Sequence, residues 1–210
     1  MTVVAIDGPS GSGKSTVARA LAERLGLEYL DTGAMYRAIA FAALQRGLDP
    51  LDGALMDKLA ADVDLVTAGP DVVVDGYDAS IEIRGPEVTK AVSAVAAHPG
   101  VRQEMVSRQR EWIRSHGGGV VEGRDIGSEV WPDAELKVYL TADLAVRAAR
   151  RKAEMAAEDR QEVADDLARR DALDSSRATS PLRRADGAIE LDTTHLTVEE
   201  IVEALLARLP

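Results

Sequence analysis

Short apolar runs alternate along this chain with longer stretches in which apolar residues recur every three or four positions. The short runs predict β-strands, and the longer stretches predict amphipathic helices. The expected strands are residues 3–6, 28–30, 119–122, 136–140 and 188–191, and the expected helices are residues 15–24, 35–45, 101–115, 144–157 and 162–173. This alternation predicts an α/β fold with a parallel sheet covered by helices.

Two local patterns refine this prediction. Residues 63–84 interrupt the alternation with Val-rich runs and an Asp75-Gly76 turn signal, which predict a small antiparallel sheet inserted between the core strands. Near the end of the chain, Thr-Val-Glu-Glu predicts a helix start with a capping box. Thr197 would cap the helix, and Glu200 would reach back to it.

Residues 8–15, GPSGSGKS, match the phosphate-binding pattern Gly-x-x-x-x-Gly-Lys-Ser and are called the phosphate loop below. The loop lies between a predicted strand and a predicted helix, so its N–H groups and the helix N-terminus would face a phosphate. Lys14 would bridge the β- and γ-phosphates of ATP or GTP, and Ser15 is the predicted Mg²⁺ ligand. The full set of predicted nucleotide-binding residues is Gly8, Pro9, Ser10, Gly11, Ser12, Gly13, Lys14, Ser15 and Thr16.

Composition narrows the possible partners. The 210 residues suffice for one α/β domain and carry a net charge of −11, which argues against broad binding to nucleic acid or anionic membranes. The chain has no cysteine, and its three histidines show no metal-ligand spacing. No apolar run has the length of a membrane span, and no signal peptide is recognised. We therefore expect a cytoplasmic protein with no nucleic-acid or membrane partner.

The arginines favour an enzyme over a nucleotide switch. Guanine-reading switches use an Asn-Lys-x-Asp motif, and this chain contains no asparagine. Nine of its 20 arginines fall between Arg147 and Arg184. Two helical stripes stand out, the first formed by Arg147, Arg150 and Arg151 and the second by Arg170, Asp174 and Arg177. Either stripe alone could be a solvated, salt-bridged face, but beside a phosphate loop both favour phosphoryl transfer to a second anionic substrate.

Several motifs together resemble those of bacterial cytidylate kinases, which are P-loop nucleoside monophosphate kinases. They are GPSGSGKST, LDTGAMYR, VVEGRDIG, RRDALDSSRATSPL and the closing IELDTTHLTVEEIV, and they extend over nearly the whole chain. The resemblance implies a P-loop NTPase-type fold with a parallel five-stranded sheet, an inserted antiparallel β region and an Arg-rich lid. It implies one kinase domain over residues 1–210, with a monophosphate-binding region at about 32–102, the insert at about 63–84 and the lid at about 147–177.

The same resemblance implies an activity and a set of site residues. The activity is transfer of the γ-phosphoryl group of ATP to CMP or dCMP, with Mg²⁺, in pyrimidine nucleotide metabolism. Arg37, Arg124 and Arg177 would contact the acceptor phosphate, and Tyr36, Arg170 and Asp174 would contact the sugar. Thr32, where a serine is frequent, would lie in the same stretch as Tyr36. Ser93, Arg102 and Asp125 would read cytosine, and Lys14, Arg150, Arg151 and Asp125 are the expected catalytic residues.

The proposed base reading makes chemical sense. An acid can accept from the cytosine amino group and an arginine can donate to the ring acceptors, whereas uracil reverses part of this pattern. We therefore expect CMP to be preferred over UMP. The acceptor phosphate is itself nucleophilic, so no general base is required.

Several alternatives stay open. Asp125 could be only a turn residue, and Arg102 could be an exposed helix residue. The chain could phosphorylate UMP, AMP or shikimate, or could bind nucleotides as a regulator without an acceptor. We expect a monomer.

Overall fold

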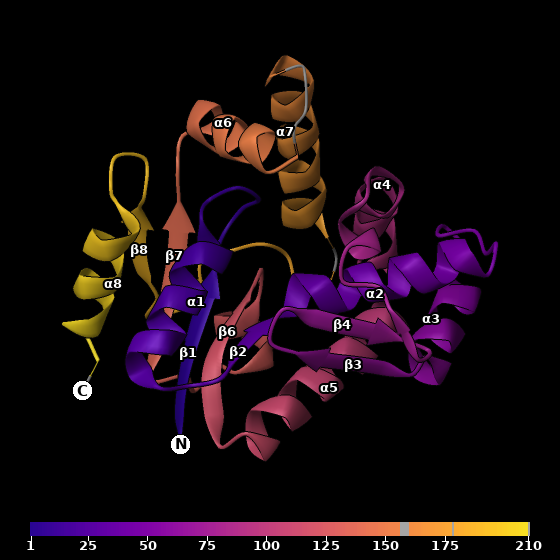
Figure 1. The fold of residues 1–210 in the computed structure, drawn as a ribbon, viewed down its shortest axis with the longest axis horizontal. Helices are drawn as coiled ribbons and strands as arrows, with labels where there is room; N and C mark the ends of the chain where they lie inside the picture. The colour runs from indigo at the N-terminus through magenta and orange to yellow at the C-terminus, as the bar shows by residue number, and fades with distance from the viewer. Residues whose placement is uncertain (156–159, 178, 210) are drawn as a thin grey trace. The chain divides into compact units, whose positions relative to one another are not determined.

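The computed structural model describes residues 1–155, 160–177 and 179–209 (Figure 1). The internal contacts divide the chain into two units, which are described separately. The first unit comprises Met1–Tyr29 and His116–Pro210, and the second comprises Leu30–Ser115. The predicted monophosphate-binding region, residues 32–102, falls within the second unit. The description of residues 1–210 as one kinase domain stays a prediction.

A five-stranded sheet forms the centre of the fold, in the strand order β2-β6-β1-β7-β8. Its strands are β1 (Thr2–Asp7), β2 (Tyr29–Asp31), β6 (Gly118–Gly123), β7 (Leu136–Thr141) and β8 (Ile189–Asp192). The pairs β1–β6, β1–β7 and β7–β8 are parallel, so the predicted parallel five-stranded α/β fold is confirmed. Because β1, β6 and β7 run in the same direction, their carboxyl ends meet at one edge, where open α/β sheets bind ligands.

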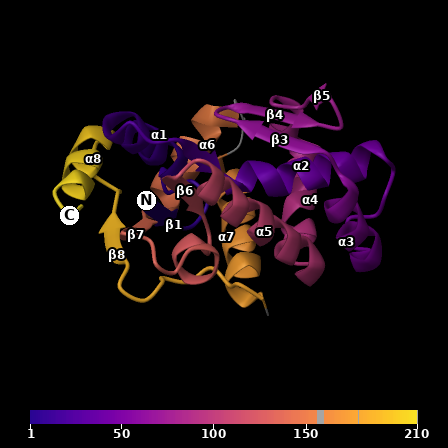
Figure 2. The ribbon, with the colours of Figure 1, turned by 90° about the horizontal axis from the view of Figure 1, so that it is seen from below.

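The central strand β1 is buried from Val3 to Asp7, which explains its unbroken apolar run. Helix α1 (Lys14–Leu25) and helix α8 (Val198–Leu206) cover one face of the sheet, and Figure 2 shows them side by side. Their shared core includes Ile6, Leu21 and Leu205. Thr197 caps α8, and Glu200 completes the predicted capping box.

The remaining helices of the first unit follow β6 and β7. They are a single π-helical turn (Ile126–Val130), α6 (Leu144–Met155) and α7 (Arg160–Ser176). The predicted end of the helix starting at Leu144 lies outside the described residues. Helix α7 begins before and ends after the predicted range of 162–173, so it is longer than expected.

The second unit is built around α2 (Thr32–Gln45), an almost entirely buried helix. The other helical elements are α3 (Gly53–Asp62), α4 (Pro86–Val95), α5 (Pro99–Ser115) and a short 3-10 helix (Glu82–Arg84). Helices α3 and α4 were not predicted. In Figure 2 the small sheet of this unit lies beside α2, and the stacked rings of Phe41 and Tyr77 join the two, with centroids 5.9 Å apart.

The insert forms an antiparallel sheet of β3 (Leu65–Ala68), β4 (Asp71–Val74) and β5 (Tyr77–Asp78), which confirms the prediction. Asp75 and Gly76 have φ values of 51° and 79°, as expected at the turn of a tight hairpin. No helix within the described residues combines the length and apolar character required to cross a membrane.

Candidate functional site

The phosphate loop leaves the carboxyl end of β1 and leads directly into α1. Gly8 has a φ of 150°, and a Cβ atom there would lie 2.2 Å from the carbonyl oxygen of Leu140, so no other residue fits. Gly13 adopts the left-handed conformation at the start of α1, and no side chain caps the helix. The first N–H groups of α1 therefore have no capping side chain, which is the arrangement that binds phosphate at a helix N-terminus.

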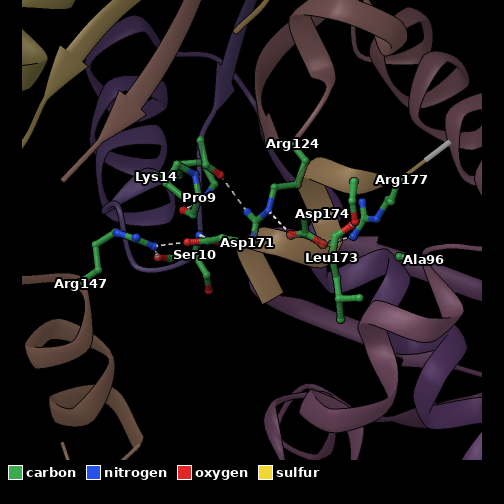
Figure 3. A network of polar contacts seen from close by, with 12 residues as sticks. Pro9, Ser10, Lys14, Ala96, Arg124, Arg147, Asp171, Leu173, Asp174 and Arg177 are labelled. Carbon is green, nitrogen blue, oxygen red and sulfur yellow. Dashed lines mark hydrogen bonds and ion pairs between the residues drawn. The ribbon is translucent and has the colours of Figure 1, made fainter. Parts of the chain in front are cut away.

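Lys14 lies in the first turn of α1 with only 7% of its surface exposed. Its Nζ donates to the carbonyl oxygen of Pro9 at 2.8 Å, so the ammonium group lies over the loop (Figure 3). Burial, assisted by the nearby charge of Arg124, lowers the pKa of Lys14, while the carboxylates of Glu122 and Asp7 act in the opposite direction. Phosphate oxygens of a bound nucleotide would add the negative charge that favours the protonated lysine.

Ser15 follows Lys14 and is partly exposed. Within residues 1–155, 160–177 and 179–209, no group of three His, Asp or Glu side chains is placed to hold a metal ion. Mg²⁺ is commonly bound by one or two protein ligands together with substrate phosphates and water. The donor set therefore fits a metal held by the Ser15 hydroxyl and the nucleotide, without a carboxylate cage.

Thr193, just beyond β8, supports the loop from the other side. Its hydroxyl lies 3.0 Å from the carbonyl oxygens of both Ser12 and Thr141. Arg150 donates from Nη1 to the Thr193 hydroxyl at 3.0 Å and from Nη2 to the Thr193 carbonyl oxygen at 2.7 Å. The expected catalytic residue Arg150 is thus held beside the phosphate loop by Thr193.

Arg124 links the phosphate loop to α7. Its Nη1 donates to the carbonyl oxygen of Gly8 at 3.0 Å, and its Nε donates to Oδ2 of Asp174 at 2.8 Å (Figure 3). The other carboxylate oxygen of Asp174 accepts from Arg177. Burial alone would raise the pKa of Asp174, but Arg124 and Arg177 together hold it below its ordinary value. Asp174 is therefore ionised, and it keeps both arginines in place.

Arg170 is on the same stripe of α7 and is 5% exposed. Its Nε is buried and has no hydrogen-bond partner among the described residues. Burial, together with the charge of Arg124, lowers its pKa to about 10, so the side chain stays protonated at neutral pH. A buried cation with incomplete pairing is costly unless an anion compensates it. The solvated-face interpretation of this stripe is therefore wrong for Arg170 and Asp174.

Arg151 follows Arg150 on α6 and also lies near the α7 stripe. Its positive charge is one of the causes that lower the pKa of Arg170. Among the predicted residues of the first unit, the structure thus gathers Lys14, Arg124, Arg150, Arg151, Arg170, Asp174 and Arg177 around the phosphate loop and the adjoining face of α7.

Asp125 is buried at the start of the π-helical turn, and its side chain makes no capping hydrogen bond there. The turn is instead held by Asp7, whose two carboxylate oxygens accept from the N–H groups of Ile126 and Gly127, each at 2.8 Å. Burial raises the pKa of Asp7 to about 7, against the effect of these two hydrogen bonds. The carbonyl oxygen of Asp125 also accepts from the N–H groups of Glu129 and Val130. The turn-residue alternative for Asp125 therefore stays open beside its predicted role in base recognition.

In the second unit, the structure brings Tyr36 and Arg102 together. The guanidinium carbon of Arg102 lies 5.3 Å from the Tyr36 ring centroid, and its Nη1 donates to the carbonyl oxygen of Ala96 at 3.3 Å. Arg102 is buried, so the interpretation as an exposed helix residue is wrong. Thr32 and Ser93 are also buried, on α2 and α4.

Arg37, next to Tyr36 on α2, donates from Nη1 to the hydroxyl of Thr89 at 3.5 Å. Ser93 and Arg102 belong to the second unit, whereas Asp125 belongs to the first. Their joint contact with cytosine therefore stays a prediction.

The sequence analysis missed Asp7, Asp171 and Thr193. Each acts through a partner far along the chain, such as Asp7 and Ile126, which are 119 residues apart. Weak signals existed: Asp7 ends an otherwise apolar strand, and Asp171 lies inside the RRDALD motif. Neither signal identifies the residue that Asp7 or Asp171 contacts, because that residue is brought close only when the chain folds.

Known proteins match this chain along nearly its whole length. The family model for cytidylate kinase matches residues 4–210. A cytidylate kinase from Rhodococcus opacus (strain B4) is 50% identical over 212 residues, covering 97% of this chain and 93% of the relative. A bifunctional pantoate ligase/cytidylate kinase from Synechococcus sp. (strain CC9902) is 49% identical over 214 residues, covering 97% of this chain. The chain spans only 44% of that longer protein.

Among solved structures, the shikimate kinase from Acinetobacter baumannii superposes with a TM-score of 0.50 at 16% identity. The superposition covers 98% of this chain and 91% of that one. At this level of identity the likeness concerns the fold alone.

Proposed function

Because the chain belongs to the cytidylate kinase family, we propose that it transfers the γ-phosphoryl group of ATP to CMP or dCMP, giving ADP and CDP or dCDP. The observation that carries the proposal is the link made by Arg124. This residue contacts the phosphate loop at Gly8, and it contacts the stripe of Arg170, Asp174 and Arg177 on α7 through Asp174. A donor site and an acceptor site for two polyanions would be joined in this way.

The acceptor phosphate needs no general base. A phosphate monoester has a second pKa of about 6, so it is largely dianionic at neutral pH and can attack the γ-phosphorus directly. The obstacle is repulsion between two polyanions. The position of Lys14 supports a role in neutralising the donor phosphates, since its ammonium group is buried over the loop and close to Arg124. Arg150 and Arg151 would stabilise charge on the transferring group, because Arg150 contacts Thr193 beside the loop and Arg151 follows it on α6.

Mg²⁺ bound with ATP would be held by the Ser15 hydroxyl, the nucleotide phosphates and water, and it would supply further charge neutralisation. The donor set around Ser15 supports this arrangement, since no acidic cage competes for the ion within the described residues. Residues 8–16 would bind the nucleotide through loop N–H groups and side chains.

On the acceptor side, we assign phosphate contacts to Arg37, Arg124 and Arg177. We assign sugar contacts to Tyr36, Arg170 and Asp174, and base recognition to Ser93, Arg102 and Asp125. Thr32 would lie in the same monophosphate-binding stretch as Tyr36. The burial of the three base-reading side chains supports selection by hydrogen bonding, because an unmatched buried polar group costs about 1–3 kcal/mol. We therefore expect cytosine to be accepted and uracil to be rejected.

An acceptor panel tests the proposal. The purified chain, with ATP and Mg²⁺, would be offered CMP, dCMP, UMP, AMP and shikimate, and ADP release would be measured for each. We expect turnover with CMP and dCMP to exceed the others. Faster turnover of UMP, AMP or shikimate would assign the chain to another small-molecule kinase activity.

A binding experiment separates the enzyme from a regulator. Calorimetry with CMP would be run alone and beside a non-hydrolysable ATP analogue, and we expect saturable CMP binding. Lack of CMP binding under both conditions would favour a nucleotide-binding regulator. The monomeric state and cytoplasmic location stay predictions, which sedimentation velocity and cell fractionation would test.

A further inference from the structure

The phosphate loop, α6 and α7 meet at a junction of three residues, Ser10, Arg147 and Asp171 (Figure 3). The N–H group of Ser10 donates to Oδ1 of Asp171 at 3.2 Å, and Nη1 of Arg147 donates to Oδ2 of the same carboxylate. Nη1 of Arg147 also donates to the carbonyl oxygen of Ser10 at 3.0 Å, which closes a triangle. Each of the three residues therefore contacts the other two.

We propose that Asp171 is a positioning residue for phosphoryl transfer. It holds α7 against the phosphate loop, and it thereby sets where Arg170 and Asp174 lie relative to the donor phosphates. This inference rests on the proposed function, since it requires Arg170 and Asp174 to contact the acceptor.

Helix geometry gives Asp171 this influence. Asp171 precedes Asp174 by three residues and Arg170 precedes it by four, so each of the two is a helical neighbour of Asp174 on α7. Asp171 binds the loop at Ser10, and Asp174 binds it through Arg124, which contacts Gly8. Two carboxylates about one turn apart thus fasten the same face of α7 to the start of the phosphate loop. A shift of the helix would break both connections.

The chemistry of the junction requires a carboxylate. Two donors from different elements point at one side chain, and an ionised carboxylate accepts from both. An asparagine would offer one acceptor oxygen and would turn its NH₂ group toward the other donor. The Arg147 and Asp171 side chains are mostly buried, so their ion pair differs from an exposed surface pair. Nε of Arg147 donates to the carbonyl oxygen of Ala142 at 3.0 Å, which fixes the guanidinium group further.

A purely structural ion pair and a positioning residue have different consequences. Loss of a structural pair would lower the melting temperature and leave the kinetic constants of the folded enzyme unchanged. Loss of a positioning residue lowers kcat in the folded enzyme, because a displacement of about 1 Å can cost on the order of 100-fold in rate. The KM for ATP should change much less, since the glycines, Lys14 and Ser15 of the loop are retained.

The first test compares Asp171→Asn with Asp165→Asn in the full-length chain. Both variants remove one negative charge from α7, but Asp165 is exposed and outside the junction. Steady-state assays with CMP, ATP and Mg²⁺ would be normalised to the folded fraction from circular dichroism melting. For Asp171→Asn we expect kcat to fall about 10- to 100-fold and the KM for ATP to stay within about threefold. Asp165→Asn should behave as the wild type.

A double-mutant cycle gives the second test. Arg147→Lys keeps the positive charge but loses the forked donor, and by itself it should reduce kcat as Asp171→Asn does. If both residues act through one junction, the double variant should be little slower than the slower single variant. Asp171→Glu keeps both acceptor oxygens and should recover part of the rate. Arg147→Lys reports on the junction even if Asp171→Asn does not fold.

The inference is overturned if folded Asp171→Asn keeps kcat within twofold of the control, or if the two single losses simply multiply in the double variant. It is also overturned if Asp171→Glu is no faster than Asp171→Asn. Failure of the proposed function is distinguishable, because the wild-type chain would then show no CMP phosphorylation at all.

Discussion

The surroundings of the phosphate loop and the small sheet β3–β5 use charged side chains in opposite ways. Near the loop, Lys14, Arg170 and Asp174 are each less than a tenth exposed, and the charge of Arg124 acts on all three. Beside the small sheet, the ion pair of Arg46 and Asp75 has both side chains 43% exposed. Buried charges are costly to assemble and retain strong interactions, whereas exposed pairs contribute little to stability.

The two regions therefore differ in the part that charged side chains play in holding them together. The small sheet is held by apolar contacts, including buried Val72 and Val74 and the stacked rings of Phe41 and Tyr77. Its charged groups lie on the surface of this apolar framework. Around the phosphate loop, contacts between charged groups themselves join the loop to α6 and α7, and a bound polyanion would add further negative charge to this set. Substitutions in the two regions should therefore differ in the size and in the kind of their effects.

The largest effect is expected from Lys14→Ala. Removing the buried ammonium group takes away charge stabilisation of the transferring phosphoryl group, and kcat should fall about 1000-fold for every acceptor. Steady-state assays with CMP and dCMP would measure this loss. A residual kcat within tenfold of wild type would contradict the central role of this lysine.

Asp7→Asn should change how stability depends on pH. Burial raises the pKa of Asp7 to about 7, so its protonated form stabilises the fold at low pH, and this contribution is lost as pH rises from about 4 through 7. The asparagine cannot ionise and does not show this loss. Relative to wild type, the variant should therefore gain about 2–3 kcal/mol of unfolding free energy between pH 5 and pH 8. Urea unfolding of the variant and the wild type at both pH values tests this. The prediction is refuted if the difference in unfolding free energy between the two proteins is the same at pH 5 and pH 8.

Asp125→Ala should alter selectivity more than rate. Loss of a buried acceptor worth about 1–3 kcal/mol should reduce the CMP-to-UMP ratio of kcat/KM about 10- to 100-fold. Asp133→Ala is a matched control, because Asp133 is exposed after the π-helical turn. Equal losses for CMP and UMP in the Asp125 variant would remove this residue from base recognition.

The smallest effect is expected in the second region. Arg46→Ala removes the donor that lowers the pKa of Asp75, but the pair is exposed. The unfolding free energy should fall by no more than about 1 kcal/mol, less at high salt, and kcat should not change. Urea unfolding with and without 1 M NaCl measures the loss of unfolding free energy and its dependence on salt. A loss above about 2 kcal/mol would show that this pair resembles the buried ones after all.

Much of the fold follows from local sequence pattern. The apolar run of β1, the Val-rich insert and the capping box at Thr197 each carry a signal within a few residues, and the structure confirms them. Helix α4 gave a weaker signal. Its segment PEVTKAVSAV is rich in β-branched residues, which have modest helix propensity, and its helical form depends on packing against α2.

The candidate site was predictable where chemistry follows a motif. The phosphate loop and the stripe of Arg170, Asp174 and Arg177 could be identified from spacing and from family resemblance. The contacts that hold these elements in place could not be identified from the sequence. Asp7 orders a turn 119 residues away, and Asp171 contacts Ser10 across 161 residues, so both depend on tertiary structure.

The outer strands of the main sheet have a consequence for behaviour at high concentration. Strand β2 has three residues and β8 has four, and Glu190 and Asp192 point their charged groups to solvent along β8. Short, acidic edges offer a neighbouring chain few free backbone groups and repel an identical edge. Such margins should discourage strand-by-strand aggregation during refolding from denaturant, even though the centre of the sheet is composed of strongly β-forming valines and isoleucines.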